Sequence, residues 1–336
     1  MNTTVPTASP ITKEVLKALS LRMGFQCCIP ASHLPLAGSP ERSRKRMAIQ
    51  TEQGFWVLEA FSPDQILRKQ EIITFLFQLE RLGLRSLLLP LKDEEGRVFF
   101  KHQKTFFQIT PHITCEDLPR PAYLLDAWRG WELAGFVMDL LSKKTDMETF
   151  VRKEGKTSFA RKAFDIRSYI VTLMQGIRIR RRDLYERLFS IQIWTEEALS
   201  PYMEKVPKTF CHGDLHPINV LWGKKHLLHL IDWEFCGIKP EIHDMANLLG
   251  CLGSENPKAL EGPFAEAFLT RIAESGHISQ AGWQALVPMV VAIRFCWLSE
   301  WLRKEDTAMI TLECHYLELL VHHAGDIQQL WHSLVT

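Results

Sequence analysis

Residues 211–234 read Cys-His-Gly-Asp-Leu-His-Pro-Ile-Asn-Val-Leu-Trp, then a short basic bend, then His-Leu-Leu-His-Leu-Ile-Asp-Trp-Glu. The first part places Asp214 and Asn219 five positions apart on a loop that follows the turn-forming Gly213. Apolar residues at 227–231 predict a strand, and this strand carries a second acid, Asp232, at its end. Two acids and one amide therefore lie in a single loop-and-strand segment.

These side chains are of the kinds that phosphoryl transfer to a hydroxyl requires. Asp214 is the candidate catalytic carboxylate, which would accept or orient the proton of the attacking hydroxyl. Asn219 and Asp232 offer oxygen atoms to Mg²⁺, a hard cation that prefers oxygen ligands and keeps several waters. His212 lies two residues before Asp214 and is the second candidate catalytic residue. It is expected to brace the backbone of the loop rather than to take part in the chemistry. Each residue alone also fits a turn or a packing role, but their joint spacing favours catalysis.

The segment His212–Leu221, together with Ile231–Glu234, resembles the aminoglycoside phosphotransferase and choline kinase family of small-molecule kinases. The resemblance extends to Asp244, an acid that in this family commonly caps the following helix and braces the catalytic region, and Glu234 is assigned similar structural support. Weaker similarity in the order of elements spans residues 35–305. The resemblance implies an α+β, protein-kinase-like fold with two lobes, ATP as co-substrate and Mg²⁺ as cofactor.

The composition is that of an ordinary globular protein. The 336 residues are 46% hydrophobic and 24% charged, and the net charge of +1 argues against a general nucleic-acid binder. No uninterrupted apolar run approaches the ~18 residues of a membrane span, and the N-terminus lacks the pattern of a signal peptide. The eight cysteines form no C-x-x-C pair, which favours free thiols in a reducing compartment. We expect a cytoplasmic protein without nucleic-acid or membrane partners; the oligomeric state is left open.

The order of elements predicts an antiparallel-sheet small lobe over residues 1–111 and a mainly helical large lobe over residues 112–336. Residues 1–10 are polar and contain prolines, which predicts a loose tail. A Gln-Gly turn at 53–54 favours a hairpin. The predicted helices cover 12–24, 63–82, 121–143, 158–181, 183–204, 242–253, 258–275, 279–303 and 306–333, and the predicted strands lie within 34–61 and at 86–91, 97–101 and 104–110.

Two stretches of the small lobe are candidates for nucleotide binding. Gly38 and Ser39 occupy the place of a phosphate-covering loop, although the full glycine pattern is missing and an ordinary turn is the alternative. By resemblance, the stretch after the last strand is the hinge whose backbone binds the adenine ring. The hinge residues are Thr110, Pro111, His112 and Ile113.

Glu59 is the main departure from the kinase pattern, because it stands on the strand where a phosphate-binding lysine is normal. An acid repels phosphate. Arg44 and Arg46 share one face of the preceding strand and could supply a replacement cation, with Glu59 paired to one of them or to Lys69. Alternatively, residues 42–46 are a solvated run and the enzyme is weak or inactive.

A helix near 288–303 carries Trp297, Glu300 and Trp301 at helical spacing, which suggests a site for an amine-bearing acceptor or, alternatively, ordinary core packing. The leading interpretation is a kinase whose partner is a small-molecule hydroxyl acceptor. A non-catalytic nucleotide-binding or scaffold protein, suggested by Glu59, and a kinase acting on a protein side chain remain alternatives. The intact set of Asp214, Asn219 and Asp232 favours an enzyme over a scaffold.

Overall fold

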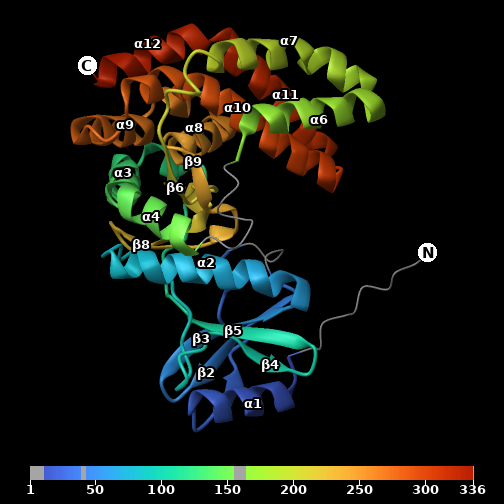
Figure 1. Ribbon diagram of the computed structural model, residues 1–336, viewed down its shortest axis with the longest axis vertical. Helices are drawn as coiled ribbons and strands as arrows, with labels where there is room; N and C mark the ends of the chain where they lie inside the picture. Colours follow the sequence, from blue (N-terminus) through green and yellow to red (C-terminus); the bar gives the residue numbers. More distant parts are fainter. Residues whose placement is uncertain (1–10, 39–42, 155–163, 336) are drawn as a thin grey trace. The chain divides into compact units, whose positions relative to one another are not determined.

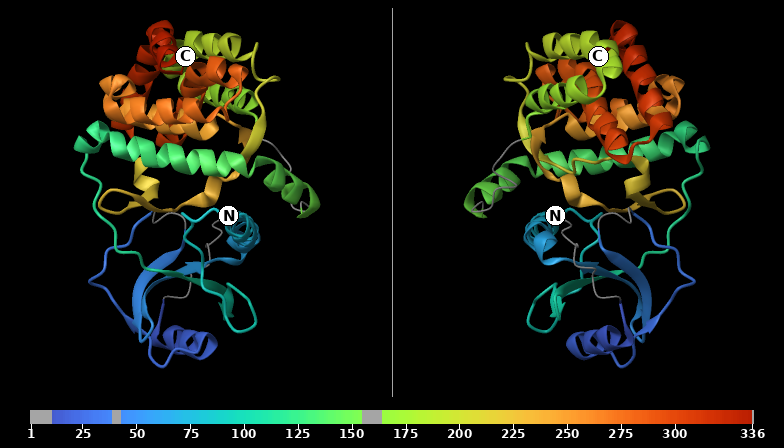
Figure 2. Two further views of the ribbon diagram at one scale, coloured as in Figure 1. Left: turned by 90° about the vertical axis from the view of Figure 1, so that its left-hand side faces the viewer. Right: turned by 90° about the vertical axis from the view of Figure 1, so that its right-hand side faces the viewer.

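The computed structural model describes residues 11–38, 43–154 and 164–335, and the chain forms two compact units (Figures 1 and 2). The first unit contains the N-terminal part of the chain and two later segments, and the second contains the remainder. The first unit is Met1–Glu116, Ile218–Gly223 and Leu228–Glu234; the second is Asp117–Pro217, Lys224–Leu227 and Phe235–Thr336. The lobe boundary between residues 111 and 112 stays a prediction.

A five-stranded antiparallel sheet forms the centre of the first unit, in the order β1-β2-β3-β5-β4. The hairpin expected at the Gln-Gly turn is present, and it joins β2 to β3. The sheet confirms the predicted pairing of the two strand-rich stretches. Its strands are β1 (Ile29–Pro30), β2 (Lys45–Thr51), β3 (Gly54–Phe61), β4 (Phe100–His102) and β5 (Thr105–Pro111).

Two helices, α1 (Lys13–Met23) and α2 (Pro63–Arg81), flank this sheet (Figure 1). Helix α1 packs its apolar residues into a core with Leu58 and Ala60 of β3. Successive side chains of a strand point to opposite faces, so Glu59 points to the other face. Helix α2 begins at a capping box in which Ser62 and Gln65 satisfy each other's polar groups.

Two predicted strands of the first unit are wrong. Residues 34–38 form no strand, because Pro35 has no N–H to donate and Gly38 has φ +83°, outside the strand region. The stretch 86–91 makes only an isolated bridge, from Leu87 to Leu230. Pro90 interrupts that stretch and prevents a continuous ladder.

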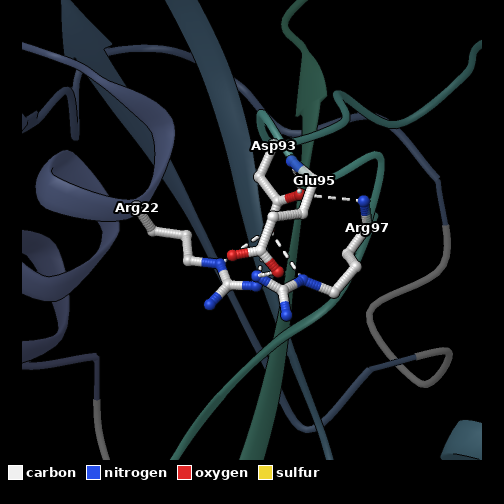
Figure 3. Close-up of polar contacts among 4 residues, drawn as sticks. All are labelled: Arg22, Asp93, Glu95 and Arg97. Carbon is white, nitrogen blue, oxygen red and sulfur yellow. Dashed lines mark hydrogen bonds and ion pairs between the residues drawn. The ribbon is translucent and has the colours of Figure 1, made fainter.

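A loop before β4 is fixed to α1 by a buried acid, Asp93 (Figure 3). The Nε of Arg22 donates to Asp93 at 2.7 Å, and the backbone N–H groups of Glu95 and Arg97 donate to it at 3.0 and 2.8 Å. Burial raises the pKa of Asp93, but these donors and the Arg22 charge outweigh it and lower the pKa to about 2. The Asp93 carboxylate therefore holds the loop in place, where regular strand hydrogen bonds do not.

The second unit is mainly helical, as predicted, and the mixed α+β class is confirmed. The 306–333 helix is two helices, because the chain turns at His323. Three short elements were not predicted: α4, β6 and β9. The helices are η2 (Ala122–Leu125), α3 (Ala127–Ser142), α4 (Lys144–Glu154), α6 (Ile166–Arg180), α7 (Arg182–Leu199), α8 (His243–Glu255), η5 (Pro257–Glu261), α9 (Pro263–Ser275), α10 (Gln280–Lys304), α11 (Thr307–His322) and α12 (Ala324–Val335).

Short strands and 3₁₀ turns carry the motif segment. Strand β6 pairs antiparallel with β9, and β7 pairs with β8. These elements are β6 (Lys208–Cys211), η3 (Pro217–Asn219), β7 (Val220–Trp222), β8 (Leu227–Leu230), η4 (Trp233–Phe235) and β9 (Gly237–Pro240).

Helix α10 is the central helix of the second unit and packs against α6, α7, α8, α11 and α12 (Figure 1). Among the described residues it is the one helix whose length and composition would allow it to cross a membrane. Its most apolar 18-residue stretch is 67% buried inside the protein, as in the core helix of a globular domain. The helix therefore forms the core against which α8 and the motif loop are packed.

Candidate active site

In the second unit, the loop after β6 is held by Asp244, in the first turn of α8. One carboxylate oxygen of Asp244 accepts the backbone N–H of His212 and the other accepts that of Gly213, each at 2.7 Å. Both contacts are charge-assisted when the acid is ionised. The loop that carries Asp214 is thus tied to a helix of the core, as the bracing role expected for Asp244 requires.

Gly213 is required by the geometry of this loop. Its φ of +85° lies in the left-handed region, and a Cβ there would lie 2.1 Å from the backbone oxygen of Phe235. The next residue, Asp214, donates its backbone N–H to Nδ1 of His212 at 3.2 Å. His212 is fully buried. Its imidazole therefore contacts the loop backbone, which fits a bracing role better than proton transfer to a substrate.

The Asp244 carboxylate lies in an unusual electrostatic setting. Burial raises its pKa to about 6, against the lowering effect of the two backbone donors and of the Lys239 charge. Lys239 is itself buried on β9, and burial lowers its pKa. The sequence analysis missed Lys239, since a lone lysine in a four-residue strand gives no signal. It supplies positive charge behind the loop that carries Asp214.

Asp214 also lies next to an aromatic and amide network. The Nε2 of His216 is 3.7 Å from a carboxylate oxygen of Asp214, and the His216 ring makes an edge contact with Trp297. The indole N–H of Trp297 donates to Asn247 at 3.0 Å, and the Asn247 amide donates to the carbonyl of Leu215 at 3.1 Å. The structure therefore brings one of the three candidate acceptor residues, Trp297, to the loop that carries Asp214.

The other two candidate acceptor residues have their polar groups engaged within the protein. The indole N–H of Trp301 donates to Glu313 at 3.3 Å, and Glu313 forms a buried ion pair with Arg294. Glu300 pairs with Arg303 and Lys304, whose donors lower the pKa of Glu300 to about 2. Contact of these two residues with an acceptor stays a prediction.

In the first unit, Asn219 and Asp232 are brought together by the hairpin of β7 and β8. The N–H of Ile231 donates to the backbone oxygen of Asn219 at 3.0 Å, which places Asp232 one residue away. Asp232 has φ +62°, a left-handed conformation that is unusual outside glycine and is found at functional sites. A Cβ on Gly38 would lie 3.3 Å from the Asp232 carboxylate, so the Gly38 backbone approaches it closely.

The donor set fits Mg²⁺ bound together with a nucleotide. Asn219 and Asp232 provide one amide and one carboxylate oxygen donor. Mg²⁺ commonly binds proteins through one or two such ligands, with phosphates and waters completing an octahedron. Within residues 11–38, 43–154 and 164–335, no cluster of three or more His, Cys, Asp or Glu side chains suits a metal. Asn219 and Asp232 suit a site shared between the protein and the nucleotide phosphates.

Glu59 lies in a row of charged residues on the face of the sheet that α2 covers. Arg46 is directly opposite Glu59 on β2, and its Nε lies 3.5 Å from the carboxylate. The same guanidinium donates to the carbonyls of Ala37 and of Gly38, the latter at 3.0 Å. Burial raises the pKa of Glu59, and the nearby charges of Lys69 and Arg46 lower it. Of the partners expected for Glu59, Arg46 is therefore paired directly.

The remaining members of this region come from α2 and from η4. Lys69 forms an ion pair with Glu234, two residues after Asp232, and Arg68 also contacts Glu234. Glu234 thus ties the motif segment to α2, in line with the structural support expected of it. Arg44 lies 4.0 Å from Asp64, near the start of the same helix. Ser39 falls outside the described residues.

The predicted hinge continues β5. Thr110 and Pro111 pair with Val57 and Trp56 of β3. The N–H of His112 donates to the oxygen of Phe55 at 2.9 Å, and its Nε2 is hydrogen-bonded to the carbonyl of Pro35 at 2.8 Å.

The N–H of His112 is therefore already used by the sheet. Ile113 is the first predicted hinge residue beyond this pairing. Binding of the adenine ring by the backbone of these hinge residues stays a prediction.

Comparisons with known proteins agree with this geometry. The model of a family described as "Phosphotransferase enzyme family" matches residues 162–286, which include Asp214, Asn219, Asp232 and Asp244, and this match confirms the predicted resemblance. No curated protein matches the chain.

Solved structures resemble the chain over nearly its full length. An aminoglycoside phosphotransferase from Alicyclobacillus acidocaldarius has 13% identity and a TM-score of 0.60, covering 99% of this chain and 98% of that one. Aminoglycoside 2'-phosphotransferase-IIIa in complex with GDP has 15% identity and a TM-score of 0.61, covering 93% and 97%. An amicoumacin kinase in complex with AMP-PNP, Ca²⁺ and Ami has 12% identity and a TM-score of 0.61, covering 92% and 93%. The likeness confirms the kinase-like fold.

Proposed function

We propose that this protein is a Mg²⁺-dependent kinase that transfers the γ-phosphate of ATP to a hydroxyl group of a small molecule. The observation that carries the proposal is the support given to Asp214. Its loop is tied to α8 by two hydrogen bonds to Asp244 and contains a glycine that no other residue could replace without a clash.

The chemistry follows from the roles of these residues. Asp214 orients the acceptor hydroxyl and accepts its proton as the oxygen attacks the γ-phosphorus, the bond from that phosphorus to the β,γ-bridging oxygen breaks, and ADP leaves. Asn219 and Asp232 would hold Mg²⁺, and this cation would supply positive charge that compensates the phosphates of the nucleotide. The use of a nucleotide is supported by similar solved structures, which contain GDP and AMP-PNP.

A small molecule is the favoured acceptor, because one of the similar structures is that of a spectinomycin phosphotransferase bound to ADP and its substrate. That chain is 14% identical with a TM-score of 0.55, covering 96% of this chain and 100% of that one, so the class of acceptor and not its identity is proposed. Sugars, amino alcohols and similar metabolites are the compounds to test first.

The experiment is a screen of such hydroxyl compounds with γ-labelled ATP, GTP and Mg²⁺, read by the mass of the phosphorylated product. We expect label on at least one compound, and none when Asp214→Asn replaces the wild-type protein. Nucleotide binding without transfer to any compound or to a protein would instead favour a non-catalytic binding protein, which the acid at position 59 also suggests. Label on protein side chains alone would identify a protein kinase.

A further inference from the structure

The first unit lacks a cation on the strand where kinases place one. Position 59 of β3 is occupied by a partly buried glutamate that faces α2. A nucleoside triphosphate is a multiply charged anion, and its phosphates need compensating positive charge. Cations on the elements that surround Glu59 are therefore the candidates to supply that charge.

Lys69 of α2 has the position for this. Its ammonium pairs with Glu234, and its charge, like that of Arg46, lowers the pKa of Glu59, whereas the charge of Asp232 raises it. The side chain is 14% exposed and crosses the ring of Phe61 at 4.9 Å, which directs its stem toward β3. Lys69 is thus a cation next to the residues expected to bind the metal and phosphates.

The two arginines of the 42–46 stretch have other contacts. Arg46 pairs with Glu59 and donates to two carbonyls of the loop that ends at Gly38, so its guanidinium orders that loop. Arg44 lies at the opposite end of the row, toward Asp64. Lys69, by contrast, has an ammonium with three donor protons, and within the described residues its hydrogen bond is to Glu234.

We propose that Lys69 binds the nucleotide phosphates, so that the strand lysine and helix glutamate of a kinase are exchanged in position. Glu59 on the strand and Glu234 then hold the helix-borne ammonium, as a helix glutamate normally holds a strand lysine. Arg46 retains the loop-ordering contacts. This inference rests on the proposed function, since it concerns the nucleotide of that reaction.

The test is the affinity of the full chain for AMP-PNP with Mg²⁺ and for adenosine, measured by calorimetry. Adenosine has no phosphate, so a contact to phosphate changes the first affinity and not the second. Lys69→Gln is expected to weaken AMP-PNP binding about ten- to a hundredfold and to leave adenosine binding unchanged. Arg81→Gln, the same loss of charge at the exposed end of α2, is the matched control and is expected to bind like the wild type.

A second variant supplies the cation from the strand. The double variant Glu59→Lys/Lys69→Gln restores the usual strand lysine and is expected to regain AMP-PNP affinity. It also allows the test to be made if Lys69→Gln alone fails to fold.

If Lys69→Gln binds AMP-PNP like the wild type, if it loses adenosine equally, or if the double variant regains nothing, Lys69 is only a structural ion-pair partner. A wild-type protein that binds neither ligand would overturn the proposed function itself, and the inference with it.

Discussion

The indole N–H of Trp297 donates to the side-chain oxygen of Asn247 at 3.0 Å. The amide of the same Asn247 donates to the carbonyl of Leu215, next to Asp214 in the chain. A residue of α10 therefore reaches the backbone of the candidate catalytic loop through one intervening side chain. We therefore expect Trp297 to help position the loop, in addition to its expected contact with an acceptor.

Trp297→Phe is expected to lower kcat, because it keeps an aromatic ring but removes the donor to Asn247. The unsatisfied amide oxygen costs about 1–3 kcal/mol, and part of this cost falls on the loop. Initial rates and urea unfolding measure the two effects. Trp331→Phe is the control, because it removes an indole donor to the carbonyl of Leu260 but none to the loop. Equal loss of kcat in both variants would contradict the positioning role.

Asp214→Asn is expected to lower turnover by about 10²–10⁴ while leaving nucleotide affinity nearly unchanged. The amide keeps the shape of the side chain but cannot accept the hydroxyl proton, and a general base contributes that much to rate. Single-turnover rates with saturating nucleotide, and calorimetric nucleotide affinity, are the measurements. Turnover at the wild-type rate would exclude Asp214 as the catalytic carboxylate.

Asp232→Ala is expected to weaken binding of the Mg²⁺–nucleotide complex itself, because a metal ligand is removed. The affinity for nucleotide without Mg²⁺ should change much less, so titrations with Mg²⁺ and with EDTA provide the comparison. The roles given to the two acids would be wrong if Asp214→Asn and Asp232→Ala lost Mg²⁺–nucleotide affinity to the same degree.

Much of the fold was predictable because its signals are local. The amphipathic pattern of residues 63–82 and the Gln-Gly turn gave α2 and the β2–β3 hairpin nearly to the residue. Strands β6 and β9 were missed because each has only four residues, and their pairing joins segments far apart in the chain. The break at His323 was missed because the apolar pattern continues through it.

The candidate site was predictable as a set of residue types, together with the supporting acids Asp244 and Glu234, but the contacts of Lys239 and Asn247 were not. The spacing of Asp214, Asn219 and Asp232 is visible in the sequence. The contacts of Lys239 and Asn247 depend on tertiary packing of β9 and α8 against the loop, and the spacing of residues in the sequence does not predict them. The partner of Glu59 was narrowed by strand alternation to a few cations, and the register of β2 and β3 then selected Arg46.

Asp244 is expected to make stability depend on pH. Its folded pKa of about 6 lies above its ordinary value of 3.8, so the unfolded chain loses this proton first as pH rises. The free energy of unfolding should therefore fall between about pH 4 and pH 6, by on the order of 3 kcal/mol, and level off above. Urea unfolding from pH 4 to 7 should show this slope in the wild type and not in Asp244→Asn.

Asp93→Asn serves as the control for this pH dependence. The folded pKa of Asp93 is about 2, so its stabilising contribution is complete above about pH 4 and is lost only as pH falls toward 2. Its variant should be less stable than the wild type by a constant amount from pH 4 to 7. A wild-type slope that persisted in Asp244→Asn would assign the pH dependence to other groups.

The first unit is discontinuous in the chain, since it takes in Ile218–Gly223 and Leu228–Glu234 from far beyond its sheet. The backbone of Leu230 donates to Ser86, and that of Glu116 donates to Trp222, so these late segments belong to its hydrogen-bonded structure. Such a unit cannot be excised by a single cut, and a gene fragment ending near residue 116 encodes an incomplete body. Truncation of this protein, or exchange of one part with another protein, is therefore expected to disrupt both units, because they cannot be separated as modules.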